Sequence, residues 1–151
     1  MKSIFVKSIT LCFLLKSIVG ISAATETYEQ YSVDWSLIEK KARKGDVFSQ
    51  TALGEYYLIV KNDLVQGERW LLMASKQGDA EAQFNLARLY FGQKKYDDFY
   101  FWIEKSVEQQ HPSSEYFLGL VMKIPNPELS RSLIARACSH GYEKACKDLN
   151  Y

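Results

Sequence analysis

The side chains that could carry out catalysis are few, and they lie far apart in the sequence. Beyond residue 24 the histidines are His111 and His140, and both stand beside predicted turns. The adjacent acids Asp97 and Asp98 lie at a predicted helix start, where a carboxylate favours the helix dipole. A catalytic site needs a nucleophile with a base, paired acids or a metal. The sequence contains neither a serine nucleophile elbow nor a phosphate-binding glycine loop. It therefore predicts binding rather than catalysis, with no cofactor and no metal.

Composition predicts a globular chain whose partner is not a nucleic acid. The 151 residues are 47% apolar and 25% charged, and 3 prolines with 8 glycines are too few for a turn-rich β-sandwich. All 18 acidic residues follow residue 24, whereas three of the 19 basic residues precede it. The chain after residue 24 therefore has a net charge of 16 − 18 = −2. It lacks the basic patch that phosphate binding requires.

The first 24 residues have the order of a secretory signal. Two lysines provide a positive end, an apolar stretch follows, and the small residues at 22–24 offer a cleavage site. The stretch is too short for a stable membrane span, and Lys16 interrupts it. We expect a leader at 1–24, one domain at 25–151, and a periplasmic or secreted location. An N-terminal membrane anchor and a buried first helix are the alternatives.

The elements that position the remaining side chains repeat along the chain. A turn recurs with spacings of 33, 32 and 31 residues, at Gly45, Gly78, Gln110 and Gly141. Eight residues after the turn stands a leucine each time, at Leu53, Leu86, Leu118 and Leu149. The next position is small in three copies, and reads Gly54, Ala87, Gly119 and Asn150. Eight residues before the turn stands a large apolar side chain, at Leu37, Trp70, Trp102 and Leu133.

Each period contains two amphipathic helical patterns. In the second copy Gly78 ends one helix in the left-handed conformation and Asp79 caps the next. Because one helix pair cannot bury its apolar stripe alone, stacking of pairs must supply the core. The pattern predicts an all-α fold, an α-solenoid of stacked antiparallel helix pairs. Eight helices are expected, near 34–44, 47–60, 64–76, 80–91, 96–109, 113–123, 127–139 and 142–149.

Segment 78–90 resembles the Sel1-like repeat, a relative of the tetratricopeptide repeat. Its sequence is GDAEAQFNLARLY, and Trp70 and Ala74-Ser75 upstream match the same pattern. The resemblance covers about residues 35–150, as three repeats and a terminal half-repeat. It implies a superhelical stack. One departure is that the glycine-rich link between the two helices of a repeat is missing, which gives shorter repeats.

Cys138 and Cys146 lie eight residues apart on either side of the turn at Gly141. Small secreted members of the family that this chain resembles have a disulfide at this spacing, which implies the same pairing here. Two buried free thiols are the alternative. A metal site that adds His140 is disfavoured, because the spacing does not suit zinc and a fourth ligand is missing.

The resemblance also implies a binding surface. In tetratricopeptide arrays the first helix of each repeat lines the concave face, and its variable positions contact ligands. Carried over, this gives partner-binding candidates at Phe48, Glu55, Leu58, Phe84, Arg88, Phe91, Tyr116 and Lys123. Phe84 and Tyr116 are equally compatible with core positions.

We therefore expect an exported protein-protein interaction module. Its most concrete form is a bacterial periplasmic immunity protein that neutralises a secreted antibacterial effector, and this step is a fold-level analogy. The alternatives are a cell-envelope enzyme that acts on a β-lactam or peptidoglycan-like ligand, and a general envelope scaffold or host-interaction factor.

Overall fold

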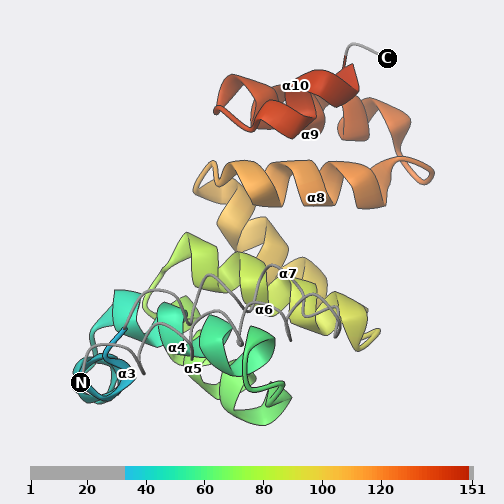
Figure 1. Cartoon of the computed structure of the whole chain (residues 1–151). Coiled ribbons are helices and arrows are strands. Elements are labelled where there is room, and N and C mark those ends of the chain that lie inside the picture. The colour runs from blue at the N-terminus through green and yellow to red at the C-terminus, as the bar shows by residue number, and fades with distance from the viewer. Residues whose placement is uncertain (1–32, 150–151) are drawn as a thin grey trace, which may run out of the picture. The chain divides into compact units, whose positions relative to one another are not determined.

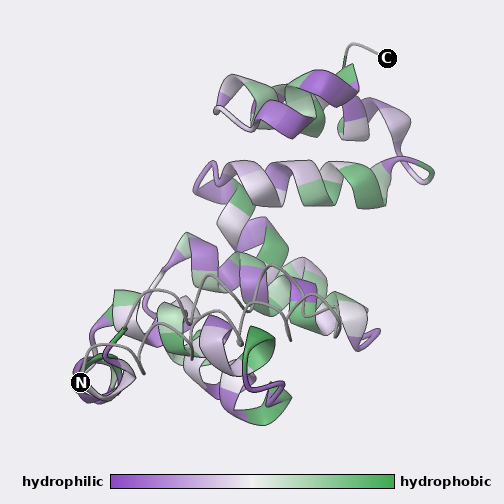
Figure 2. Ribbon diagram, viewed as in Figure 1, coloured by the Kyte–Doolittle hydropathy of each residue, from purple (hydrophilic) through white to green (hydrophobic). Residues whose placement is uncertain are grey.

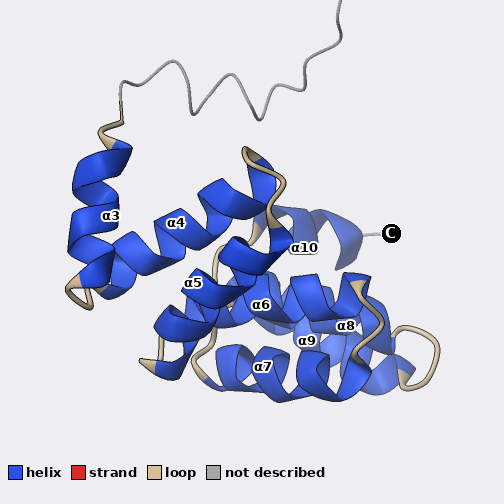
Figure 3. Cartoon of the chain, turned by 90° about the horizontal axis from the view of Figure 1, so that it is seen from below, coloured by secondary structure: helices blue, strands red, loops and turns tan. Residues whose placement is uncertain are grey.

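Eight helices make up the regular structure of residues 33–149, the part of the chain that the computed structural model describes (Figure 3). The predicted leader at 1–24 lies outside these residues, so its cleavage stays a prediction. The helices are α3 (Trp35–Arg43), α4 (Val47–Ile59), α5 (Leu64–Lys76), α6 (Ala80–Gly92), α7 (Tyr96–Glu108), α8 (Pro112–Met122), α9 (Pro127–Ser139) and α10 (Glu143–Leu149). Each predicted helix boundary lies within one residue of the observed one. Over the same range, no helix is long and apolar enough to cross a membrane.

The helices stack in chain order, which confirms the predicted solenoid (Figure 1). From α3 to α10 each helix packs on the next, and α4 also contacts α6, the equivalent helix one repeat later. The least extensive of these consecutive contacts joins α7 to α8. Apolar and polar residues alternate along every helix, as an amphipathic stack requires (Figure 2).

The predicted turn position adopts one backbone conformation in all four copies. Gly45, Gly78 and Gly141 have φ angles of 95°, 95° and 91°, and Gln110 has a φ of 60°. All four lie in the left-handed region that ends a helix, which glycine enters without steric cost. The third copy therefore keeps the repeat geometry with a non-glycine residue at its turn.

The apolar columns form the core, except at the two ends of the stack. Leu53, Leu86 and Leu118 are buried, and so are Trp70, Trp102 and Leu133. The terminal members of the same columns, Leu37 and Leu149, are 48% and 38% exposed. They differ because within residues 33–149 no further helix pair covers them.

The small residues allow the two helices of a repeat to approach closely, as predicted. A Cβ atom added to Gly54 would lie 2.5 Å from Cγ of Leu71, and one added to Gly119 would lie 2.8 Å from Cγ1 of Ile134. Ala87, at the same position of the second repeat, is fully buried. The side chains across from these positions therefore fill the space that a larger residue would need.

A buried polar position, five residues after each turn, ties the repeats together. Gln50 and Gln83 each donate from Nε2 to the backbone oxygen of the residue eight positions earlier, at 3.0 and 3.2 Å. Each also accepts a hydrogen bond from a glutamine of the next turn. Glu115 holds this position in the third repeat, and its Oε2 lies 2.7 Å from Nδ1 of His140. In the fourth copy the position is Cys146, which forms a disulfide with Cys138. The implied pairing is thus confirmed, and it replaces the amide hydrogen bond of the earlier repeats.

Candidate functional site

A hollow of 260 Å³ lies between α4 and α6, the first helices of two successive repeats. It is lined by Glu55, Leu58, Ile59, Leu64, Asn85, Arg88 and Leu89. Three of these, Glu55, Leu58 and Arg88, are among the eight predicted partner-binding residues. Its lining combines aliphatic side chains with the charged groups of Glu55 and Arg88, a mixture that ligand pockets typically have.

A chain of hydrogen bonds runs from this hollow across the repeats. Asn85 donates from Nδ2 to Glu55 Oε1 at 2.7 Å and to Glu81 Oε1 at 3.1 Å. The other carboxylate oxygen of Glu81 lies 3.0 Å from Nε2 of His111, at the start of α8. On α6, the guanidinium of Arg88 lies 5.4 Å from the centre of the Phe84 ring. Side chains of α4, α6 and α8 therefore fix the geometry of this surface before any partner binds.

The two carboxylates that share Asn85 have pKa values shifted in opposite directions. Burial raises the pKa of Glu55, and the negative charge of Glu81 adds to the shift. A hydrogen bond with His111 lowers the pKa of Glu81, against an opposing effect of burial. Glu81 is thus held as a carboxylate by its neighbours, whereas Glu55 gains from any additional hydrogen-bond donor or cation.

The lowered pKa of Glu81 predicts a pH-dependent loss of stability in the variant Glu81→Gln. A carboxyl group with a lowered folded-state pKa contributes stability above its unfolded-state pKa, and this contribution disappears as the pH falls through the folded-state value. The variant should therefore be less stable than wild type at pH 7, and the difference should shrink below about pH 4, the ordinary range for glutamate. Urea unfolding at pH 7 and below about pH 4 measures the difference in free energy of unfolding between the variant and wild type. Glu104→Gln, at an exposed acid of α7, is the matched control. An equal loss at both pH values would contradict the assignment.

His111 also completes an acid–histidine–serine arrangement that resembles a catalytic triad. Its Nδ1 lies 2.9 Å from Oγ of Ser114, while Glu81 contacts the opposite ring nitrogen. Ser114 is fully buried, however, and its Oγ also lies 2.6 Å from Oγ of Ser106. Because a substrate carbonyl could not reach this hydroxyl, the arrangement acts as a brace between α7 and α8.

The second histidine is a structural tie as well. His140 contacts the buried carboxylate of Glu115, and Nη2 of Arg136 lies 2.6 Å from the other oxygen of that carboxylate. Asp97 and Asp98, the adjacent acids, are exposed in the first turn of α7. None of the four candidate catalytic residues, His111, His140, Asp97 and Asp98, lines the hollow at Glu55.

Two predicted partner-binding residues, Phe84 and Tyr116, are core residues. They occupy equivalent positions, and each lies under the turn of the following repeat. The Phe84 ring packs 5.4 Å from His111, and the Tyr116 ring packs 5.0 Å from Tyr142. The hydroxyl of Tyr116 donates to Asp148 at 2.5 Å. Both side chains are buried because the next repeat covers this part of the first helix.

The other three predicted residues lie on the surface but are not together. Phe48 on α4 is 82% exposed. Phe91 at the end of α6 is partly exposed, and its ring packs edge-on against Phe99 and Phe117. Lys123 follows α8 and lines a separate hollow between α8, α9 and α10.

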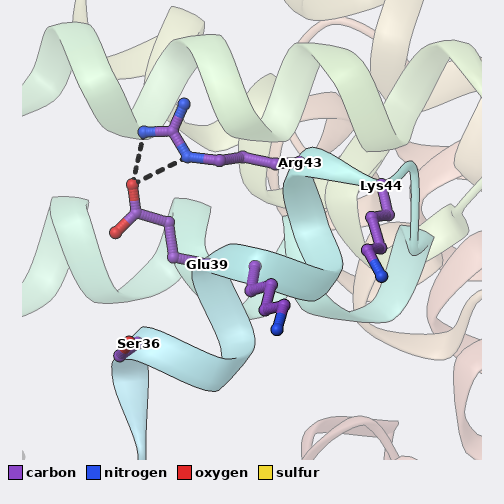
Figure 4. A pocket seen from close by; sticks show the side chains of 5 residues that line it. Ser36, Glu39, Arg43 and Lys44 are labelled. Atoms are coloured by element: carbon purple, nitrogen blue, oxygen red, sulfur yellow. Dashed lines mark hydrogen bonds and ion pairs between the residues drawn. The ribbon is translucent and has the colours of Figure 1, made fainter.

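Sequence reasoning missed Asn85, which lines the hollow, and Glu81, which links Asn85 to His111. Asn85 lies four residues after Glu81 and three before Arg88, so the spacing alone places all three on one face of α6. A third hollow, of 440 Å³, lies on α3 and its following turn and is lined by Ser36, Glu39, Lys40, Arg43 and Lys44 (Figure 4). There Arg43 is engaged by Glu39 of the same helix, and among residues 33–149 no second helix lines the hollow.

Comparison with known proteins identifies the repeats. No family model matches the sequence. Over 96 residues the chain is 27% identical to the sel1-like repeat-containing protein L21 of Acanthamoeba polyphaga mimivirus. The match covers 60% of this chain and only 18% of that relative's length. The crystal structure of a Sel1 repeat protein from Oxalobacter formigenes superposes with a TM-score of 0.66 at 26% identity, over 78% of this chain and 97% of that one. The chain carries Sel1-like repeats.

A second crystal structure has the same fold as this Sel1-like repeat chain. It is c5321, described as a protective antigen present in uropathogenic Escherichia coli strains and displaying an SLR fold. Its TM-score is 0.70 at 23% identity, over 76% of this chain and 27% of that one. This likeness shows the fold alone. Charged and aliphatic side chains line two hollows on this fold, one between α4 and α6 and one between α8, α9 and α10.

Proposed function

We propose that this Sel1-like repeat protein binds a protein partner on the surface formed by α4 and α6. The observation that carries the proposal is the hollow at Glu55 and Arg88, where aliphatic side chains lie beside Arg88 and beside the Glu55 carboxylate, which Asn85 holds by a hydrogen bond. Side chains that are held in place before binding lose little conformational freedom when a partner arrives. The hollow is therefore the centre of the proposed interface.

An exposed aromatic residue extends this surface along α4. Phe48 lies seven residues, two helical turns, before Glu55, so both are on one face of the helix. Ile59 and Leu64, at the other end of the hollow, are each about half exposed. Aromatic and aliphatic groups around a charged centre are the composition of an energetic hot spot in protein interfaces. Phe48 is the anchor that we expect to contribute most.

Export of the chain is part of the proposal. The disulfide between Cys138 and Cys146 supports it, since structural disulfides persist in oxidising compartments such as the periplasm and the extracellular space. The most concrete function is that of a bacterial periplasmic immunity protein, whose partner is a secreted antibacterial effector. It needs a rigid binding surface and no catalytic group.

Site-specific photo-crosslinking tests the binding surface. A benzophenone amino acid replaces Phe48 in one variant and Phe101, a half-exposed phenylalanine of α7, in the matched control. Cells that express each variant are irradiated, and covalent adducts are identified by mass spectrometry. We expect a discrete protein adduct from position 48 and none from position 101. Adducts of equal yield from both positions, or from position 101 alone, would place the partner elsewhere.

The immunity role has a separate test. Cells that express and export the partner identified by cross-linking should stop growing, and co-expression of the wild-type chain should restore growth. The double variant Phe48→Ala/Arg88→Ala should fold normally, because both side chains are exposed, but should not protect. A partner that does not harm cells would exclude the immunity role and leave the binding surface intact.

A further inference from the structure

One contact between the two helices of a repeat is apolar and closed in two copies, and polar and open in the third. The contact joins two residues: the one thirteen positions after the turn, and the fourth residue of the repeat's second helix. In the first repeat a Cβ atom added to Gly67 would lie 2.4 Å from Cδ2 of Leu58, so that leucine covers the glycine. In the second, the Phe91 ring packs 5.1 Å from that of Phe99. The third repeat has Lys123 and Ser130 at these positions, and both line a hollow of 690 Å³.

Ser130 is a polar side chain on the wall of this hollow. The residue is 4% exposed, and its hydroxyl makes no hydrogen bond within residues 33–149. The hydroxyl oxygen is not one of the fully buried side-chain atoms that lack a partner, so it is accessible from the hollow. Because Ser130 lines the hollow, an acceptor that enters the hollow can satisfy it.

The charges around the hollow favour an anion. Lys123 and Arg131 both line it, both are exposed, and neither has an ion pair within the described part of the chain. One acid, Asp148, also lines the hollow, but its carboxylate accepts the hydrogen bond of Tyr116 at 2.5 Å. The first turn of α9 adds the positive end of a 13-residue helix. Two cations and a helix N-terminus therefore face one acid that is already engaged.

The remaining walls are apolar. Leu120 and Leu149 are about 40% exposed, and Ile134 and Pro127 complete the lining. The end of α8 is hydrophobic as well (Figure 2). A ligand that fills the hollow must therefore combine a carboxylate with an aliphatic stem.

We infer that this hollow receives a glutamate side chain of the protein partner. The carboxylate accepts a hydrogen bond from Ser130 Oγ and pairs with Arg131 and Lys123. The two methylene groups of the glutamate pack on Leu120 and Ile134. A glutamate suits the site because Ser130 is only 4% exposed, so a carboxylate must reach its hydroxyl through the hollow on a stem. The inference rests on the proposed function, since it extends the partner's contact from α4 and α6 to the third repeat.

NMR titration of the full chain with small probes tests the inference without the partner. The probe is Nα-acetyl-L-glutamate N-methylamide, and its glutamine counterpart is the matched uncharged probe. We expect the amide signals of Lys123, Ser130 and Arg131 to shift saturably with the glutamate probe. The glutamine probe should bind at least about tenfold more weakly, which is the scale of one well-placed charged contact.

Variants separate a built site from a general basic surface. Lys123→Gln/Arg131→Gln should lower affinity for the glutamate probe about tenfold, whereas Arg69→Gln, at an exposed arginine of α5, should not change it. Ser130→Ala should weaken binding and leave thermal stability equal or higher, because the lost hydroxyl has no bond to lose.

Three results would overturn the inference. They are equal affinity for the glutamine probe, equal affinity for inorganic phosphate, and tighter binding of N-acetyl-leucine, which would indicate a C-terminal carboxylate instead. Its failure is distinguishable from failure of the proposed function. A cross-link from position 48 without glutamate binding rejects only the inference, and glutamate binding without that cross-link rejects only the α4–α6 surface.

Discussion

Replacement of Gly54 by alanine should destabilise the protein by about 1–2 kcal/mol, although alanine is the better helix former. The added methyl would lie 2.5 and 2.6 Å from two side-chain carbons of Leu71 and 3.2 Å from its backbone nitrogen. Leu71 is completely buried, so it cannot move aside without disturbing the core. Overpacking of this kind costs about 1–3 kcal/mol, which exceeds the gain of up to ~1 kcal/mol in helix propensity.

The same substitution at Gly92 is the matched control. Gly92 is also helical, at the end of α6, and no atom lies within 4 Å of an added Cβ. Gly92→Ala should therefore be neutral or stabilise the protein by up to ~1 kcal/mol. Urea unfolding followed by circular dichroism measures both variants. If Gly54→Ala proved as stable as wild type, the two helices of the first repeat would not cross as closely as described.

Removal of the disulfide should cost about 2–3 kcal/mol, the chain-entropy value for so short a loop. The double variant Cys138→Ala/Cys146→Ala should lose order mainly in α10. This helix has seven residues, and among the described helices it makes an extensive contact only with α9. A helix so short is not stable in isolation. Without the bond, the hydrogen bond between Tyr116 and Asp148 should open as well.

Amide hydrogen exchange locates this loss. Protection should fall in α10 and at the end of α9, while the amides of α4 to α7 keep wild-type protection. Reductant should reproduce the effect in the wild-type chain and should change nothing in the double variant. Uniform loss of protection along the stack would mean that the C-terminal half-repeat supports the earlier repeats instead of capping them.

The local features of the fold could be predicted from the sequence because neighbouring residues cause them. Helix boundaries follow from caps such as Asp79, whose carboxylate accepts the backbone N–H of Ala82 at 2.7 Å. The turns follow from the left-handed conformation at Gly78 and its equivalents. Periodicity then indicates which face of each helix is apolar, and so the columns of Leu53 and Trp70 were found as core.

The lining of the hollow between α4 and α6 could be predicted only in part. Glu55, Leu58 and Arg88 were found because first-helix positions recur with the repeat. Their link through Asn85 was not, since it joins residues 30 positions apart. The resemblance that supplied these positions also selected Phe84 and Tyr116, which periodicity cannot separate from surface positions on the same helix.

The sequence by itself thus determined the helices, the turns, the stacking and the close crossings, because these depend on short-range sterics and on a periodic apolar pattern. The tertiary structure alone decided which first-helix residues stay exposed. The turn of each following repeat lies over Phe84 and Tyr116 but leaves Phe48 and Arg88 uncovered. It also decided that the Ser130 hydroxyl has no hydrogen-bond partner within residues 33–149. Such outcomes depend on the distances between side chains of different repeats, which no local pattern encodes.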